Sequence, residues 1–273
     1  MTSQSDKARK FRSLHERDGF FIIPNPWDVG SARLLAAMGF EALATTSMGF
    51  AYSLGRMDGK AGRDDVLAHC RTLSAASDLP VSADFENAFA DAPRQAAENI
   101  LRAAETGLVG CSIEDFTGDP SRPIYDFELA VERVSAAAEA VQSLGFPFTL
   151  TARAENLLHG VNDLDDTIRR LRAFEVAGAD VLYAPGLKTL EDVRRVTGAL
   201  SKPVNVLASM VQGANAEQLG AAGAKRISVG GALARAALGS LLRAGMEMRD
   251  QGSFDWLADI APVADVNRML GTF

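Results

Sequence analysis

Acidic side chains stand where short apolar runs of this sequence end. Asp84 and Glu86 close the run VSADFE, and Glu114 closes GCSIE. Because strand side chains alternate between faces, Asp84 and Glu86 would point the same way if the strand continued. Such like charges repel unless a cation relieves them, and oxygen-only ligands suit Mg²⁺ or Mn²⁺ rather than zinc. Since Mg²⁺ often takes only one or two carboxylates directly, we expect Asp84 to bind the ion and Glu86 and Glu114 to act mainly through water.

A single arginine comes straight after another apolar run. Arg153 ends TLTAR, and its planar guanidinium can grip a carboxylate or phosphate with two N–H groups. An ion pair with Glu86, Glu114 or Glu155 is the alternative, and both roles are compatible. Arg153 is therefore predicted to contact the substrate, its acidic neighbours, or both.

Further polar and aromatic residues follow the ends of other runs. The stretch TTSMG offers an anion a tight turn of backbone N–H groups and the hydroxyls of Thr46 and Ser47. Asn205 lies in a later apolar run and is a candidate substrate ligand. Trp27 follows the first run, where it either lines a pocket or packs as an aromatic. His159, within AENLLHG, is either an acid–base group or a loop histidine with a structural role.

Eight short apolar runs alternate with amphipathic helical segments. The runs are typical of buried parallel strands, and most helical segments end in a glycine, as helix C-termini do. The predicted strands cover residues 21–24, 42–45, 81–84, 110–114, 148–152, 181–184, 204–207 and 227–229. Eight such repeats in about 230 residues predict a (β/α)₈ TIM barrel, whose site lies at the C-terminal ends of the strands. A doubly wound open sheet is the alternative, but no early strand is followed by a Gly-x-Gly-x-x-Gly turn.

The composition limits the classes of partner. The chain has 273 residues, of which 47% are hydrophobic and 23% charged. A net charge of −7 with scattered Lys and Arg argues against a nucleic-acid stripe or a basic membrane patch. No apolar run approaches the about 20 residues of a membrane helix, and the N-terminus lacks the apolar core of a signal peptide. The two cysteines have no metal or disulfide spacing. We expect a cytoplasmic protein that binds neither nucleic acid nor membrane.

The chain is expected to form one barrel domain over residues 1–273, with an N-terminal helix at about 5–18 and a C-terminal helical extension at about 232–273. The extension is longer than a barrel needs. It either packs across a subunit interface or folds back on its own barrel.

Five motifs resemble those of the isocitrate lyase/phosphoenolpyruvate mutase superfamily. They follow one another in the family's order and spacing, and they read NPWDVGSARLLAAMGFEALATTSMGFAYSLGRMDG, SADFENAFAD, GCSIEDFTGD, TARAEN and PVNVLA. The resemblance implies a (β/α)₈ barrel that binds Mg²⁺ and small 2-oxo or 2-hydroxy acids. It also implies a homotetramer in which partner subunits exchange a C-terminal helix, which agrees with the surplus helix of this chain.

The resemblance also implies roles for individual residues. The turn Thr46-Ser47-Met48 would hold a substrate carboxylate through N–H groups. Asp58 would lie near the metal, and Arg153 would grip the substrate. The metal site of the family corresponds to Asp84, Glu86 and Glu114.

The loop after the fourth predicted strand acts as a lid in this superfamily and divides it by reaction. Isocitrate and methylisocitrate lyases carry a Lys-Lys/Arg-Cys-Gly-His stretch there, whereas this loop reads EDFTGDPSRPIYD. It also matches poorly the lids of the mutase and of phosphonopyruvate hydrolase. Cys111 lies three residues before Glu114 and should face the helices, so we do not expect a cysteine-dependent lyase. The loop offers only Thr117, Arg122 and Tyr125.

These features together predict cleavage of a carbon–carbon bond in a small 2-oxo or 2-hydroxy dicarboxylate, similar to oxaloacetate or malate, through an enolate that Mg²⁺ stabilises. Decarboxylation needs no lid acid. Retro-aldol cleavage needs an acid and a base, and the candidate catalytic residues are Asp58, Arg153, Glu155 and Tyr125. The alternatives are the phosphorus–carbon chemistry of phosphonopyruvate hydrolase or phosphoenolpyruvate mutase, and a 2-oxo-acid binder without turnover.

Overall fold

The computed structural model describes residues 2–273, in which eight strands alternate with helices. The first helix, α1 (Gln4–Glu16), precedes the repeats and is capped by Ser3, whose side chain accepts the Asp6 N–H. The strands are β1 (Phe21–Ile23), β2 (Leu43–Ala44), β3 (Val81–Ala83), β4 (Gly110–Glu114), β5 (Thr149–Arg153), β6 (Val181–Tyr183), β7 (Val204–Leu207) and β8 (Arg226–Ser228). The helices that follow them are α2 (Val29–Ala37), α3 (Ser47–Ser53), α4 (Arg63–Ser74), α5 (Pro93–Ala104), α6 (Phe127–Gln142), α7 (Leu164–Val176), α8 (Leu190–Gly198), η1 (Ala208–Met210), α9 (Ala216–Ala221), α10 (Ala232–Asp250), η2 (Asp255–Asp259) and α11 (Val263–Leu270).

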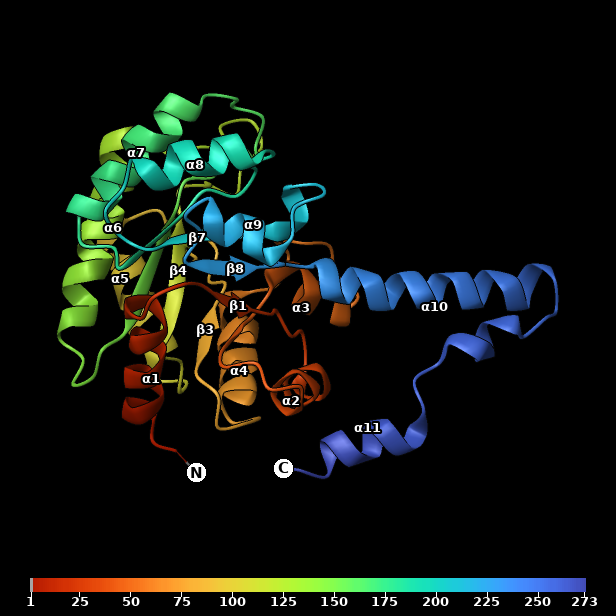
Figure 1. Ribbon diagram of the computed structural model, residues 1–273. Coiled ribbons are helices and arrows are strands. Elements are labelled where there is room, and N and C mark those ends of the chain that lie inside the picture. The colour runs from red at the N-terminus through yellow and green to blue at the C-terminus, as the bar shows by residue number, and fades with distance from the viewer. Residues whose placement is uncertain (1) are drawn as a thin grey trace.

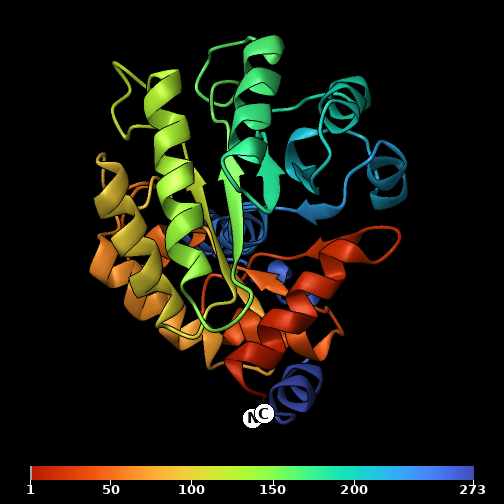
Figure 2. The same cartoon turned by 90° about the vertical axis from the view of Figure 1, so that its left-hand side faces the viewer.

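All eight strands run parallel in one sheet, in the order β1-β8-β7-β6-β5-β4-β3-β2. The gap between β1 and β2 is bridged where the Ala44 N–H donates to the Pro24 carbonyl over 3.1 Å. Asn25 ties the same corner, because its amide donates to the Thr45 carbonyl over 3.0 Å and its Oδ1 accepts two N–H groups that follow β8. The sheet is a nearly closed barrel with helices around it (Figures 1 and 2), which confirms the predicted (β/α)₈ fold.

Apolar side chains fill the layer between strands and helices. Cys111 and Ile113 of β4 and Leu150 of β5 belong to one large core cluster with the inner faces of the helices. The positions between them line the barrel interior, and many of these carry hydroxyl or amide groups rather than the branched apolar side chains usual in such barrels. Cys111 therefore lies in the helix-facing layer, as predicted, and the polar interior leaves room for a ligand.

Helix α1 closes the N-terminal end of the barrel. Phe11 is fully buried there and packs with Phe21 and Val109. Gly110 has no space for a side chain, because a Cβ would lie 2.5 Å from the Thr149 carbonyl oxygen and 3.4 Å from the Phe11 ring. The accessible end of the barrel is the C-terminal one.

The segment after β2 differs from the sequence prediction. A tight turn is expected at TTSMG, but helix α3 begins there instead. Thr46 caps this helix by accepting the Gly49 N–H over 3.3 Å. A Cβ on Gly49 would lie 2.7 Å from the Thr46 methyl group and 2.9 Å from Trp27 Cβ, so a close approach requires glycine. The Ser47 N–H of this first turn donates to Asp84, and among residues 2–273 the Met48 N–H has no hydrogen-bond partner.

The C-terminal extension forms an arm. Helix α10 projects away from the barrel, and the chain returns through η2 to α11, which packs against α2 (Figure 1). Several apolar side chains of the arm are exposed: Leu241 65%, Leu242 58%, Met246 51%, Phe254 58%, Ile260 53% and Val263 72%. The extension therefore contacts its own barrel through α11 while most of α10 is left in solvent. Among residues 2–273, no helix has both the length and the apolar character needed to cross a membrane.

Candidate active site

Arg153, the last residue of β5, is the centre of an ion-pair network at the open end of the barrel. Its Nη1 lies 2.6 Å from Asp84 Oδ1 and 3.4 Å from Glu114 Oε2, and its Nε donates to Glu155 Oε1 over 2.8 Å. The guanidinium carbon lies 5.0 Å from the centroid of the Tyr183 ring. Burial acts against the charge, but the three carboxylates outweigh it and raise the pKa of Arg153 well above its ordinary value. Ion pairing with acidic neighbours, one of the two roles expected for Arg153, is thus present.

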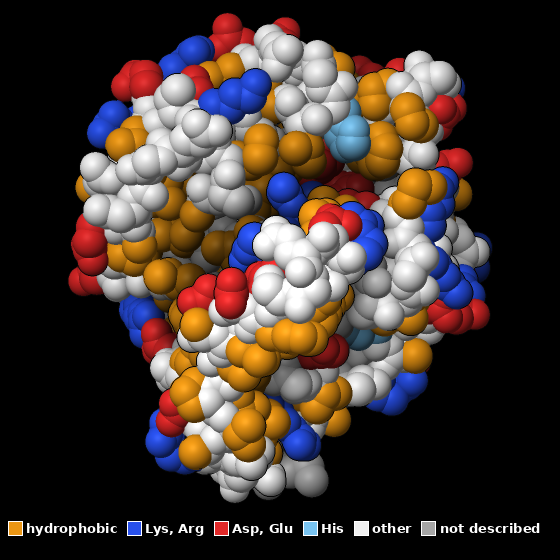
Figure 3. Space-filling view, turned by 90° about the vertical axis from the view of Figure 1, so that its right-hand side faces the viewer, with side chains coloured by type: hydrophobic (Ala, Val, Ile, Leu, Met, Phe, Trp, Pro, Cys, Tyr) orange, Lys and Arg blue, Asp and Glu red, His pale blue; other side chains and the backbone are white. Residues whose placement is uncertain are grey.

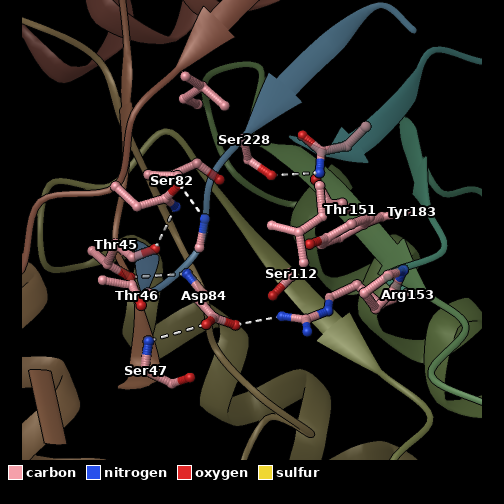
Figure 4. A pocket seen from close by; sticks show the side chains of 18 of the residues that line it. Thr45, Thr46, Ser47, Ser82, Asp84, Ser112, Thr151, Arg153, Tyr183 and Ser228 are labelled. Carbon is pink, nitrogen blue, oxygen red and sulfur yellow. Dashed lines mark hydrogen bonds and ion pairs between the residues drawn. The ribbon is translucent and has the colours of Figure 1, made fainter. Parts of the chain in front are cut away.

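Asp84 stands between this arginine and the first turn of α3 (Figure 4). Its Oδ2 accepts the Ser47 N–H over 3.0 Å while Oδ1 accepts from Arg153. Its own N–H donates to the Thr45 hydroxyl over 2.9 Å. Met48 packs against the backbone that follows β8. The stretch expected to bind an anion and the acid expected to bind a metal therefore contact each other directly.

The loop after β3 has an unusual backbone that two buried side chains hold in place. Three of its residues have positive φ angles that residues other than glycine rarely adopt: Glu86 (48°), Ala88 (57°) and Phe89 (55°). Asn99 of α5 donates to the Ala88 carbonyl over 2.8 Å. Arg133 of α6 is 1% exposed and donates to the carbonyl of Asp91 over 2.7 Å. These contacts fix the course of the loop that carries Glu86.

The carboxyl groups around Asp84 disfavour one another's charge. Burial, followed by the charges of Asp84 and Asp58, raises the pKa of Glu86 to about 7. Burial raises the pKa of Glu114 well above its ordinary value, although Arg153 acts in the opposite direction. At the exposed mouth, partial shielding from water and the Asp84 charge raise the pKa of Asp58. The rim thus holds more carboxyl groups than one guanidinium can neutralise, and a divalent cation would relieve this excess.

The donor chemistry fits Mg²⁺ or Mn²⁺, since every candidate ligand is a carboxylate. Asp84 lines the cavity described below, and Glu86 and Glu114 flank it outside the cavity wall. Within residues 2–273, no three His, Cys, Asp or Glu side chains converge closely enough to hold an ion by themselves. The arrangement is compatible with an ion that has Asp84 as a direct ligand and water between it and the two glutamates. That coordination stays a prediction.

A cavity of about 160 Å³ leads from this rim into the barrel. Thr46, Ser47, Met48 and Asp58 line its mouth. Its deeper wall carries hydroxyl and amide groups from six strands: Ser82, Ser112, Thr151, Tyr183, Asn205 and Ser228. This volume is large enough for several waters or for one small organic acid.

The floor of the cavity contains an arginine that the sequence prediction missed. Asn205, a predicted substrate ligand, donates to Ser228 Oγ over 2.9 Å and accepts from Arg226 Nε over 2.8 Å. Arg226 also donates to Thr151 Oγ1 over 3.2 Å. The prediction starts the eighth strand at Ile227 and so leaves Arg226 outside it. Its spacing of two from Ser228 within one strand is the signal that places both side chains in the barrel.

Two predicted site residues lie outside the cavity. Trp27 lines a separate groove between α2, α3 and α4. Tyr125 is 4% exposed, its hydroxyl donates to Asp91, and the Arg133 guanidinium lies 4.3 Å from its ring centroid. Neither Trp27 nor Tyr125 lines the cavity in this structure, and the contact of each with substrate stays a prediction. Trp27 takes the packing role that the sequence left open, and Tyr125 connects the loop over residues 115–126 to the loop after β3.

Glu155 and His159 form a pair behind Arg153. Glu155 is 1% exposed, and its Oε2 lies 3.6 Å from His159 Nε2. The His159 ring stacks on Phe116 with 3.7 Å between centroids. Glu155 therefore positions Arg153 from outside the cavity wall, and His159 has the structural contacts of a loop histidine.

The loop over residues 115–126 is a small ordered hairpin. Phe116 and Ile124 pair in antiparallel fashion, and the Thr117 N–H donates to the Pro123 carbonyl over 2.8 Å. Arg122 is exposed.

Figure 3 shows the end of the barrel from which α10 projects, where acidic side chains lie in a hollow beside the arm and hydrophobic side chains gather on the arm itself.

Comparison with known proteins places this site in a family. The family model for phosphoenolpyruvate phosphomutase matches residues 11–249. A crystal structure from Burkholderia cenocepacia, described as a putative lyase/mutase, is 56% identical, covers 97% of this chain and 95% of its own, and has a TM-score of 0.94. The 2,3-dimethylmalate lyase structure is 26% identical over 99% of this chain and 96% of its own, with a TM-score of 0.85.

An uncharacterised protein of Mycobacterium tuberculosis is 31% identical over 220 residues, which are 80% of this chain and 80% of that protein. Its similarity and the match to the family model both span the strands that carry Asp84, Glu114 and Arg153. The chain belongs to the phosphoenolpyruvate mutase family, within the isocitrate lyase/phosphoenolpyruvate mutase superfamily of lyases and mutases.

Proposed function

We propose that the protein is a Mg²⁺-dependent carbon–carbon lyase or decarboxylase for a small 2-oxo or 2-hydroxy dicarboxylate. The observation that carries this proposal is the position of Asp84, held between the Ser47 N–H and Arg153 on the cavity wall, among more carboxyl groups than Arg153 can neutralise. The relationship to 2,3-dimethylmalate lyase supports cleavage of a dicarboxylate.

Asp84 would hold the Mg²⁺ ion directly, with Glu86 and Glu114 as its water-bridged partners. When bound there, the ion would withdraw electrons from the 2-oxo group and stabilise negative charge as an enolate develops. Burial, together with neighbouring carboxylates, raises the pKa of Glu86 and of Glu114, and a cation beside them would stabilise their charged forms.

Arg153 would orient the carboxylate end of the substrate. Two of its nitrogens are occupied by carboxylates, and Nη2 has no hydrogen-bond partner among residues 2–273. Glu155 holds the guanidinium in place through Nε. The Met48 N–H at the start of α3 would add a donor to the same carboxylate, since the neighbouring Ser47 and Gly49 N–H groups already donate to Asp84 and Thr46.

Asp58 is the group we propose to accept a proton from a 2-hydroxy substrate. It lines the mouth of the cavity and its pKa is raised by partial shielding and by Asp84. A general base works best when its pKa approaches the working pH. A decarboxylation would not need this step, since the group that leaves is CO₂.

Phosphorus–carbon chemistry is the second candidate, and one observation favours it. Arg226 adds a second guanidinium to the cavity wall, so an anionic phosphonate would meet more positive charge than Arg153 alone supplies. The exposed Arg122 in the lid loop does not line the cavity and adds nothing to this charge.

The test is turnover of four compounds by the purified protein: oxaloacetate, 2,3-dimethylmalate, 2-methylisocitrate and phosphonopyruvate, each with Mg²⁺ and with a chelator. We expect Mg²⁺-dependent cleavage of at least one dicarboxylate, lost in Asp84→Asn, a change that keeps the side-chain shape. Turnover of phosphonopyruvate alone would establish the second candidate. Metal-dependent binding without turnover of any compound would identify a 2-oxo-acid binder.

We also propose that the α10–α11 arm packs against other copies of the chain in a homotetramer. The apolar side chains exposed along α10 and after it would gain cover in this way. Light scattering should give four times the 29.0 kDa chain mass, and Leu241→Glu combined with Leu242→Glu should lower that mass. A monomer in the unaltered protein would refute this assembly.

A further inference from the structure

The floor of the barrel cavity is formed by a guanidinium without an acidic partner. Arg226 is 6% exposed and lines the cavity. Its Nε donates to Asn205 and its Nη2 to Thr151, both neutral groups. Its Nη1 is buried and has no hydrogen-bond partner within residues 2–273. The group therefore keeps unused N–H donors inside the barrel.

Among residues 2–273, no acidic group forms an ion pair with Arg226. Burial lowers its pKa to about 10, with Tyr183 acting in the opposite direction and Arg153 in the same one, so the group is still protonated near neutral pH. An isolated buried cation is costly unless it is paired. An arginine retained only for packing would be expected to end on a carboxylate or on backbone carbonyls, as Arg133 does.

The guanidinium groups of Arg153 and Arg226 lie at different depths in the barrel, Arg153 at the rim and Arg226 below it. Arg226 binds the Thr151 hydroxyl, and Thr151 precedes Arg153 by two residues on β5, both facing the cavity. Two residues of strand span about 7 Å. A ligand held at the rim by Arg153 would therefore need only a few further bonded atoms to reach Arg226.

Neighbouring side chains hold the Arg226 group in a fixed orientation. Asn205 accepts from Nε on one side and is itself fixed by donating to Ser228. Because guanidinium nitrogens lie in one plane, fixing Nε and Nη2 also fixes Nη1. A donor oriented in advance in this way is suited to a planar carboxylate.

We propose that Arg226 is the specificity-determining residue that receives the distal carboxylate of a dicarboxylate substrate, while the rim holds its 2-oxo or 2-hydroxy acid end. This inference rests on the proposed function and deepens it, because it separates dicarboxylates from monocarboxylates as the substrate class. A phosphonate is the other anionic group that the same donors could attract, and the experiment below includes it.

The experiment measures dissociation constants by calorimetry with Mg²⁺-loaded protein. The probes are malate and 2-hydroxybutyrate, which differ by a carboxylate in place of a methyl group, together with oxalate, which requires only the rim, and phosphonopyruvate. The variants are Arg226→Met, Arg226→Gln and Arg226→Lys. Arg172→Met is the matched control, because Arg172 is exposed on α7 and donates to the Ala199 carbonyl.

We expect the unaltered protein and the control to bind malate about 100-fold more tightly than 2-hydroxybutyrate, the order of magnitude expected for a hydrogen bond between charged groups. Arg226→Met and Arg226→Gln should bring this ratio close to one without changing oxalate affinity, and Arg226→Lys should keep part of it. If the Met variant does not fold, the Gln and Lys variants carry the comparison.

Three results would overturn the proposal and differ from one another. If the unaltered protein binds oxalate but binds malate and 2-hydroxybutyrate with equal affinity, the distal subsite is refuted and the proposed function is not. Equal weakening of all probes in the Arg226 variants would give Arg226 a purely structural role. Dependence on Arg226 for phosphonopyruvate but not for malate would replace the carboxylate with a phosphonate. Failure of the unaltered protein to bind oxalate would instead refute the proposed function, and this inference with it.

Discussion

Arg153 and Arg226 are the same residue type, line the same cavity and differ in everything that surrounds their charge. Arg153 contacts Asp84, Glu114 and Glu155 within 3.4 Å. The hydrogen bonds of Arg226 go to neutral oxygens alone, and one nitrogen has no partner within residues 2–273. One guanidinium is thus surrounded by more negative charge than it can balance, and the other by none.

The difference indicates two kinds of missing partner. The rim lacks positive charge, which a divalent cation would supply, while the floor lacks negative charge, which an anionic ligand would supply. A ligand with a metal-chelating end and a distal carboxylate would satisfy both at once. The predictions that follow test this contrast, beginning with the largest effect.

The same substitution should lower the free energy of unfolding at one of the two positions and not at the other. Arg153→Met leaves three carboxylates without their common partner and should lower the free energy of unfolding by about 3–5 kcal/mol. Arg226→Met removes an unpaired charge and should leave that free energy unchanged or raise it. Urea denaturation at neutral pH, without ligand, measures both. A loss of equal size in the two variants would contradict the contrast.

Replacing Arg153 by lysine should impair substrate handling while keeping the positive charge. A lysine ammonium cannot reproduce the fork that serves Asp84 and Glu155 together. We expect kcat/KM to fall about 100-fold through loss of orientation, as determined by steady-state kinetics on the best substrate of the four. Near-normal kinetics would reduce Arg153 to a structural ion pair.

Magnesium affinity should rise with pH through the range in which Glu86 ionises. The pKa of this carboxyl is raised to about 7, so the proton competes with the cation below that pH. Between pH 6 and pH 8 the ionised fraction of such a group rises from about one-tenth to nine-tenths, which predicts up to about tenfold tighter binding. Calorimetric titration with Mg²⁺ measures this change, and Glu86→Gln should flatten it. An affinity independent of pH in the unaltered protein would exclude Glu86 from the site.

The smallest effect on stability and activity is expected for Tyr125, which lies outside the cavity. Tyr125→Phe removes the hydrogen bond to Asp91 outside the cavity and should cost about 1 kcal/mol of stability. Its kcat/KM should change by no more than about twofold. A loss of activity much larger than the loss of stability would restore Tyr125 as a catalytic candidate.

The strands could be predicted from the sequence because a buried parallel strand is a short apolar run bounded by turn residues. Each of the eight lies within one residue of its predicted bounds. The side chains that leave the strand ends, Asp84, Glu114 and Arg153, could be predicted as neighbours for the same reason, since the strand ends meet at one rim.

Other parts of the site depend on contacts that local patterns do not encode. A seven-residue helix follows β2 because Gly49 allows close packing against Trp27, and the sequence favours a turn there. The Tyr125 hydroxyl turns to Asp91, which lies 34 residues away in sequence. Arg226 is the first residue of its strand and follows Lys225, and in sequence two adjacent charges are typical of an exposed strand end. Only the geometry of the barrel shows that the Arg226 side chain is buried.

The most direct test of the metal site at the rim is anomalous X-ray diffraction from crystals grown with Mn²⁺ and oxalate. We predict one strong peak in direct contact with an Asp84 carboxylate oxygen, with oxalate bound to the ion and water between the ion and both Glu86 and Glu114. A peak elsewhere in the molecule, or oxalate bound beside Arg153 with no ion at Asp84, would contradict it.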